Sequence, residues 1–189
     1  TMDVYLNYPE HRLEVQQRID YTNVTSETLD TVVLNVHPNH NRNTFELNDI
    51  KVDVDGERVQ PETSILDVRL TVDLPRILEP NEHVTLFLDY TLDLPRINPA
   101  EEFSGGGFGY SKQAVSLGNW YPVLAPYRQD GGWYGLKYFP VGAPYVTEVA
   151  DYNVTITTTQ GVVIAGTGAE AHEGNLWNFR AEKARSFAF

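Results

Sequence analysis

The side chains in this sequence that could take part in chemistry are few, and most are poorly spaced for it. His37 and His40 lie three residues apart in HPNH, whereas Glu101 and Glu102 are adjacent. Two histidines do not complete a zinc site, which needs a third protein ligand, so we expect HPNH to form a surface turn. Neighbouring residues of an extended segment point in opposite directions. We therefore expect the two glutamates to form a solvated acidic turn and not a catalytic pair.

Other signatures of a self-sufficient active site are absent from the sequence. The chain has no cysteine, no serine embedded in a nucleophile elbow and no H-E-x-x-H motif of a zinc peptidase. We therefore predict that this chain alone is not an enzyme, contains no metal site and carries no cofactor.

The glycine-rich stretch Gly105–Gly109, followed at once by YSKQ, suggests a loop with a special backbone. Glycine-rich loops can hold phosphate, but no Lys-Ser or Lys-Thr pair follows at the required spacing, and no helix is expected behind the glycines. A mobile turn is the simplest interpretation. A hinge beside a ligand cleft is the alternative, and the neighbouring Tyr110 and Gln113 make it plausible.

Bulk composition indicates a packed globular protein and excludes some partners. The chain has 189 residues, of which 41% are hydrophobic, and a formal net charge of −12. So acidic a surface repels a phosphate backbone, which argues against nucleic-acid binding. No apolar run approaches the ~20 residues that span a bilayer. The chain opens without a signal-peptide pattern and closes on SFAF, which has the pattern of an unfinished strand, so we expect that both ends were cut.

Alternation of apolar and polar residues dominates the chain and predicts β-strands. In LEVQQRIDY, at residues 13–21, only Gln17 interrupts the apolar face. The segments 65–75 (ILDVRLTVDLP) and 84–94 (VTLFLDYTLDL) alternate most regularly, and the Pro80-Asn81 turn between them predicts a hairpin. Further strands are expected in this list of segments: 32–36, 49–53 before the Asp55-Gly56 turn, 113–117, 150–157, 161–166 (GVVIAG), and 176–181 after the Gly174-Asn175 turn.

No sustained helical periodicity accompanies these strands. We therefore predict a single all-β domain over residues 1–189, mainly antiparallel, built as a sandwich or as strongly twisted, saddle-like sheets. Residues 95–147 form a long loop region with an aromatic insert, and such a loop in a compact domain is usually functional. Its aromatic side chains could pack on the domain's own loops, stack on sugars or contact a partner: Trp120, Tyr121, Trp133, Tyr134, Tyr138 and Tyr145.

Two Asn-x-Thr sequons begin at Asn23 and Asn153. They matter only in a pathway that attaches glycans.

The order of segments resembles the N-terminal β domain of the aminopeptidase N family of zinc metallopeptidases, the gluzincins. The likeness covers nearly the whole chain and is carried by this list of segments: LEVQQRIDYTNVTSETLDTVVLNVHPN, VTLFLDYTLDL, YSKQAVSLGNWYPV, and VTEVADYNVTIT with GVVIAGTG and LWNFRAEKARSFAF. Family members commonly show a Cys and an Asp-Glu-Pro run soon after the aromatic–Pro pair. Here Val123-Leu124-Ala125-Pro126 follow instead, which is similar to a divergent bacterial branch.

The resemblance implies a role for several residues. Gln113, with Tyr110 beside it, would contact the peptide substrate of a larger enzyme, because the family uses a Gln or Glu of this segment to hold the substrate's amino terminus. Trp120, Tyr121, Trp133 and Tyr134 would dock on a catalytic domain that follows this chain and carries the zinc. The alternative from another class is a stand-alone β-sandwich that binds glycans or a protein partner through its Trp and Tyr cluster, and a spacer or adhesion domain is a further one.

Overall fold

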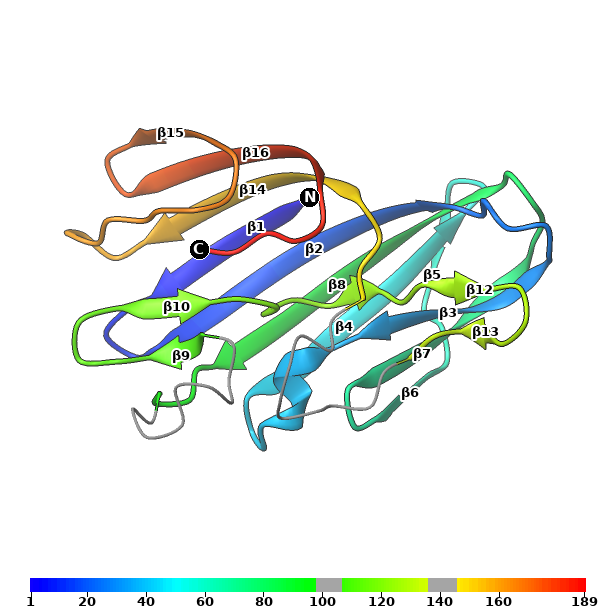
Figure 1. Cartoon of the computed structure of the whole chain (residues 1–189), viewed down its shortest axis with the longest axis horizontal. Coiled ribbons are helices and arrows are strands. Elements are labelled where there is room, and N and C mark those ends of the chain that lie inside the picture. The colour runs from blue at the N-terminus through cyan, green and yellow to red at the C-terminus, as the bar shows by residue number, and fades with distance from the viewer. Residues whose placement is uncertain (98–106, 136–145) are drawn as a thin grey trace.

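The computed structural model describes residues 1–97, 107–135 and 146–189, and these build two β-sheets and two small hairpins (Figure 1). In the described ranges the only helical element is one turn of 3-10 helix, η1 (His37–His40). The prediction of an all-β chain is therefore confirmed.

The larger sheet contains eight strands and is antiparallel except where β1 and β14 run parallel. From edge to edge its strands are β15 (Ala169–Glu173), β16 (Leu176–Ala184), β14 (Ala150–Thr158), β1 (Met2–Asn7), β2 (Arg12–Thr22), β8 (His83–Asp93), β4 (Phe45–Val54) and β5 (Glu57–Val59).

The smaller sheet contains four strands in the order β11 (Val123–Leu124), β3 (Leu29–Asn35), β7 (Arg69–Leu78) and β6 (Thr63–Leu66). One continuous apolar core joins the inward side chains of both sheets, for example Val15 and Leu88 of the larger with Val32 and Leu70 of the smaller. The two hairpins are β9 (Phe108–Tyr110) with β10 (Val115–Leu117), and β12 (Tyr127–Arg128) with β13 (Gly132–Trp133).

Gln17, the polar residue that interrupts the apolar face of β2, is buried at 6% exposure. Its Nε2 donates to the carbonyl oxygen of Pro122 at 2.9 Å, and the Tyr90 hydroxyl donates to its Oε1 at 3.1 Å. A buried amide is tolerated when its polar atoms are hydrogen-bonded. Gln17 therefore ties the larger sheet to the segment that leads into β11.

The predicted hairpin of segments 65–75 and 84–94 is wrong. β7 pairs with β3 and β6 in the smaller sheet, whereas β8 pairs with β2 and β4 in the larger one. The chain crosses between sheets at Pro80-Asn81. The real hairpin is β6–β7, with a two-residue loop at Asp67-Val68 where Asp67 has φ 54°. Because that loop falls inside the alternating run, Leu66 is 79% exposed instead of buried.

Two connections cross from one sheet to the other side by side, β2–β3 and β7–β8. Asn23, in the first of them, is hydrogen-bonded to both. Its backbone N–H donates to Glu82 O at 2.8 Å, and its carbonyl accepts from Asn81 N at 2.7 Å. Its side-chain nitrogen donates to Glu27 O at 2.8 Å and to Leu78 O at 3.1 Å. Asn23 is fully buried, and its bond to Leu78 O is buried with it, whereas the bond to Glu27 O is partly buried.

Three smaller expectations have clear outcomes. The Asp55-Gly56 turn is confirmed, with φ 64° and 86° at its two residues, and it joins β4 to β5. The Gly174-Asn175 turn joins β15 to β16 as expected. GVVIAG is not a strand, because its backbone pairs with no neighbouring strand among the described residues.

Candidate functional site

Gln113 lies at the exposed tip of the β9–β10 hairpin. The turn is held by Ser111, whose Oγ accepts hydrogen bonds from the backbone N–H groups of Gln113 at 3.2 Å and Ala114 at 3.1 Å. These bonds hold the backbone of the tip, and Gln113 is exposed there. The amide is therefore available to a ligand.

Tyr110 begins the same turn but lies in different surroundings. Its ring stacks on that of His11, with centroids 3.6 Å apart and planes at 7°. Its backbone N–H donates to Pro95 O at 2.9 Å. The preceding Gly109 has φ 134°, and a Cβ there would collide with the same carbonyl. Close approach of the two backbones is what requires glycine at this position.

Gln113 lines a hollow of about 500 Å³ whose remaining walls are mostly apolar. The other lining residues are Leu6, Tyr8, Ala114, Val115, Gly161, Val162, Val163, Ile164, Ala165 and Phe189. Strand β10 is hydrogen-bonded to the chain end there, since Leu117 N donates to Phe189 O at 2.9 Å and Phe189 N to Leu117 O at 3.2 Å. Tyr110 is not among the lining residues, so the structure does not bring Tyr110 and Gln113 into one hollow.

Trp120 and Tyr121 belong to the core. Their exposures are 0% and 1%, and the Trp120 ring makes edge-to-face contacts with Tyr121 and Phe189 at 5.1 and 5.3 Å. The Tyr121 hydroxyl accepts the backbone N–H of Phe187 at 2.8 Å, and burial raises the pKa of Tyr121 well above its usual value. Neither side chain is exposed to contact a further domain, so the docking prediction has a surface only at Trp133 and Tyr134, where it stays a prediction.

Trp133 and Tyr134 are half-buried at the β12–β13 hairpin. The Trp133 indole N–H donates to Thr31 O at 2.9 Å. Its ring contacts Tyr127 at 5.2 Å and Tyr21 at 5.8 Å. The Arg128 guanidinium lies 3.7 Å above the Tyr134 ring, a cation–π contact. Tyr138 and Tyr145 lie outside the described residues, as do the glutamates Glu101 and Glu102.

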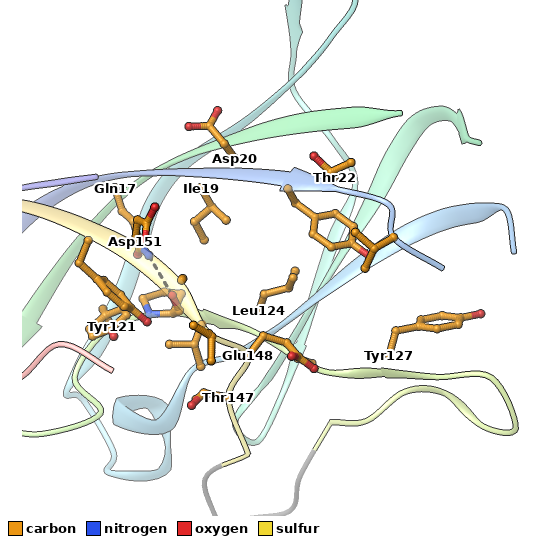
Figure 2. A pocket seen from close by; sticks show the side chains of 18 of the residues that line it. Gln17, Ile19, Asp20, Thr22, Tyr121, Leu124, Tyr127, Thr147, Glu148 and Asp151 are labelled. Atoms are coloured by element: carbon orange, nitrogen blue, oxygen red, sulfur yellow. Dashed lines mark hydrogen bonds between the residues drawn. The ribbon is translucent and has the colours of Figure 1, made fainter. Parts of the chain in front are cut away.

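A groove of about 460 Å³ runs between the C-terminal half of β2, the start of β14 and the β11–β12 segment (Figure 2). Its floor and walls are mainly apolar and aromatic. They include Ile19, Tyr21, Tyr121, Leu124, Tyr127, Trp133, Val149 and Tyr152. Three carboxylates, Asp20, Glu148 and Asp151, also line it. A concave site of this size with a few polar groups is typical of ligand-binding pockets.

The three carboxylates are engaged to different degrees. Partial burial acts to raise the pKa of Asp20, but hydrogen bonds from Arg18 and Thr85 outweigh it and hold the pKa below the usual value. Asp151 accepts the backbone N–H of Lys183 at 2.8 Å. Glu148 is exposed and makes no ion pair or hydrogen bond with another described residue. Burial, together with the nearby Tyr127 and Glu148, raises the pKa of Tyr21.

Tyr21, Tyr127 and Glu148 were not predicted as site residues. Tyr21 occupies an inward-facing position of a strand and has the sequence pattern of a core residue. Tyr127 and Glu148 lie on either side of the second undescribed segment, and only the fold brings them to one groove. Their sequence signal was weak: Tyr127 is one of many aromatic residues of the long loop region, and Glu148 is a single carboxylate just after its end.

The histidine pair HPNH is not a simple surface turn. It forms η1, in which His37 is 7% exposed, and burial lowers the pKa of His37 to about 4. Among the described residues, no group of three or more His, Cys, Asp or Glu side chains is placed to hold a metal ion. No helix in the described ranges is long and apolar enough to cross a membrane.

No family model matches this sequence, and no curated protein matches it. Solved structures do resemble the fold. A mutant M1 zinc metallopeptidase from Deinococcus radiodurans, bound to a Tyr-Ser-Ala substrate, has a TM-score of 0.55 at 17% identity. A two-domain M1 zinc metallopeptidase mutant bound to L-arginine has a TM-score of 0.57 at 16% identity. The fold is one that M1 zinc metallopeptidases contain.

The match covers nearly all of this chain but less than half of each metallopeptidase. It covers 95% of this chain and 37% of the first metallopeptidase, and 99% of this chain and 40% of the second. For a third structure, an M1 zinc metallopeptidase from Deinococcus radiodurans, the match covers 99% of this chain and 40% of that protein. Its TM-score is 0.55 and its identity 16%. The chain thus spans about two fifths of the length of these proteins. The relationship shown is one of fold, between this chain and part of a larger enzyme.

Proposed function

We propose that this chain is the non-catalytic N-terminal domain of an aminopeptidase-like zinc metallopeptidase, from a divergent bacterial branch of that family. The match of nearly the whole chain to a part of M1 zinc metallopeptidases carries this proposal. The described residues offer no metal site, so the zinc would be held by a catalytic domain outside this chain. When bound there, it would supply a metal-activated water for peptide hydrolysis.

The contribution of this chain would be to shape the substrate cleft and to dock the catalytic domain. Gln113 supports the first role, because its amide is exposed at the tip of a rigid turn, next to a hollow lined by Phe189. An amide carbonyl can accept a hydrogen bond from a substrate ammonium group, and such a bond is charge-assisted. Tyr110 would act by supporting this turn on His11. Trp133 and Tyr134 would serve the docking surface.

The coding sequence that follows Phe189 is the first test. The proposal expects an H-E-x-x-H motif with a later glutamate, the zinc-binding signature of a gluzincin. Its absence would contradict the proposal and favour a stand-alone binding module.

The second test replaces Gln113 by Ala in the longer enzyme. Loss of a charge-assisted hydrogen bond of roughly 1.5–3 kcal/mol should lower kcat/KM by roughly ten- to a hundredfold for a peptide with a free amino terminus. The same peptide acetylated at its amino terminus should show a smaller loss. Gln60→Ala, at another exposed position far from the hairpin, is the control and should change neither value. Equal losses for both peptides would mean that Gln113 does not recognise the amine.

A further inference from the structure

One end of the groove between the two sheets is a corner of three aromatic rings. Tyr127 meets Trp133 edge to face, at 86° with centroids 5.2 Å apart, and Tyr21 is tilted 57° to Trp133 at 5.8 Å. Tyr127 lies at this end of the groove in Figure 2, and Thr22, Leu124 and Glu148 also line the groove. Rings set at steep angles present both edges and faces to the same space. A face carries the negative side of the ring quadrupole and attracts cations.

The charged side chains that line the groove in the described part of the chain are all acidic. Three carboxylates line it, and none of the described lining side chains is a lysine, arginine or histidine. The α-amino group of Thr1 also lies there, but it donates to Arg18 O at 2.8 Å and has Asp20 and Asp3 as its acidic neighbours. Of the three carboxylates, Glu148 alone has no hydrogen bond or ion pair with another described residue, and it acts electrostatically on Tyr21 of the aromatic end. The formal net charge of −12 adds a negative field around the whole molecule.

Glu27, a carboxylate that does not itself line the groove, makes the aromatic corner more attractive to a cation. The Tyr127 hydroxyl donates to Glu27 Oε2 at 2.6 Å. A short hydrogen bond to a carboxylate shifts electron density from the hydroxyl toward the ring and strengthens its negative face. The indole of Trp133 is fixed in orientation by its bond to Thr31 O. The ring that interacts best with cations is thus held in place before any ligand arrives.

We propose that this groove binds an organic cation on an apolar stem, with the charged group between Trp133, Tyr127 and Glu148 and the stem along Ile19, Leu124 and Val149. The shared chemistry is an ammonium or guanidinium group, supplied either by a basic side chain of a peptide or by a small free organic cation. The apolar stem explains the exposed Val149, at 53%, and Val24, at 82%, on the rim. The proposal concerns this chain alone and does not depend on the peptidase proposed above.

The decisive comparison uses two small probes of the same shape, choline and its neutral analogue 3,3-dimethyl-1-butanol, titrated into the 189-residue chain. Binding is followed by NMR shifts of the Trp133, Tyr21 and Tyr127 ring protons. Cation–π attraction predicts that choline binds roughly tenfold more tightly than the alcohol. Equal affinity, or shifts confined to residues outside the groove, would overturn the proposal.

The variant Glu148→Gln tests the carboxylate with little risk to folding, because Glu148 is exposed. Choline affinity should fall about two- to fivefold, and the difference from the parent chain should shrink at high salt. Glu57→Gln is the matched control, since Glu57 is an exposed glutamate on the far edge strand β5. An equal effect of both variants would mean that net charge alone attracts the cation.

Two peptides distinguish the source of the cation. Both are acetylated and amidated tripeptides, one with a central lysine and the other with norleucine, which keeps the stem and lacks the charge. Preference for the lysine peptide over both norleucine and choline would assign the groove to a peptide side chain. Preference for choline over the lysine peptide would assign it to a small free organic cation. A neutral oligosaccharide that shifts the same ring protons more strongly than either cation would contradict the proposal.

Discussion

Two pairs of aromatic residues, Trp120–Tyr121 and Trp133–Tyr134, are only a short stretch of chain apart and have opposite surroundings. The first pair is buried in the core, where the Trp120 ring contacts Phe189 and the Tyr121 hydroxyl accepts the backbone N–H of Phe187. The second is half-buried beside a groove and packs on residues of β2 and its own hairpin. Aromatic type is the same in both pairs. What separates them is which distant part of the chain packs against each pair: the segment with Phe187 and Phe189 for the first, and Tyr21 of β2 for the second.

The difference between the pairs is tested most strongly by Trp120→Ala compared with Trp133→Ala. Emptying a fully enclosed indole site should lower the free energy of unfolding by roughly 3–5 kcal/mol. The same truncation at half-buried Trp133 should cost roughly 1–2 kcal/mol, mostly through the lost bond to Thr31 O. Urea unfolding of both variants measures the two values. Similar losses would mean that Trp133 is as much a core residue as Trp120.

Removing single hydroxyl groups sharpens the same comparison. Tyr121→Phe leaves the buried N–H of Phe187 without its acceptor, so the free energy of unfolding should fall by about 1–2 kcal/mol. Tyr127→Phe removes a bond to exposed Glu27 and should change stability by less than about 1 kcal/mol. Denaturant midpoints at neutral pH give the comparison. A larger loss at Tyr127 would reverse the assignment of core and surface.

Alkaline pH should lower the stability of the folded chain through buried Tyr121 of the first pair. Burial raises the folded-state pKa of Tyr121, and that of Tyr90, above the ordinary value of 10.0. Between the ordinary and the raised pKa the folded chain holds protons that the unfolded chain has lost. Stability is therefore complete below about pH 10 and falls as the pH rises further. Unfolding midpoints between pH 9 and pH 11 should decline less in Tyr121→Phe than in the parent chain, and an identical decline would contradict this.

The smallest expected effect on stability is that of Gln113→Ala. The side chain is exposed at a turn whose bonds come from the backbone and Ser111, so the free energy of unfolding should change by less than about 0.5 kcal/mol. Thermal unfolding of this chain checks the value. A loss above 1 kcal/mol would show that Gln113 is part of the framework, and its effect on activity in a longer enzyme could then be indirect.

Strand positions could be predicted well from the sequence because alternation is a local property. Leu86, Leu88 and Tyr90 of β8 are buried as their pattern predicts, and the Asp55-Gly56 turn follows from local backbone preference. Strand partners were harder to predict. β7 and β8 have matched lengths and a turn between them, yet their apolar faces belong to different sheets. Local pattern does not encode whether a turn closes a hairpin or crosses a core.

The candidate site likewise depends on contacts between distant parts of the chain that a local sequence pattern does not encode. The sequence predicts a strand over residues 113–117, whereas Gln113 lies in the turn before β10, and the groove needs β2, β14 and the β12–β13 hairpin to meet. Tyr21 has the sequence pattern of an ordinary inward residue, and its neighbours Tyr127 and Trp133 lie more than 100 positions further along. No local signal marks residues that become neighbours only through the sheet order. Burial of Trp120 likewise depends on Phe189, at the other end of the domain.

The way Asn23 fastens the two crossings has a consequence for covalent modification. Asn23 begins an Asn-x-Thr sequon, and a glycan would be attached to the same nitrogen that donates to Glu27 O and Leu78 O. A substituted amide keeps one hydrogen and cannot maintain both bonds, and the sugar would have to fit where water is excluded. In a cell that glycosylates this chain, Asn23 is accessible only before the two sheets close. Attachment of a glycan would then compete with the two hydrogen bonds that this nitrogen makes in the folded chain. Asn153, exposed on β14, carries no such conflict and can accept a glycan on the finished domain.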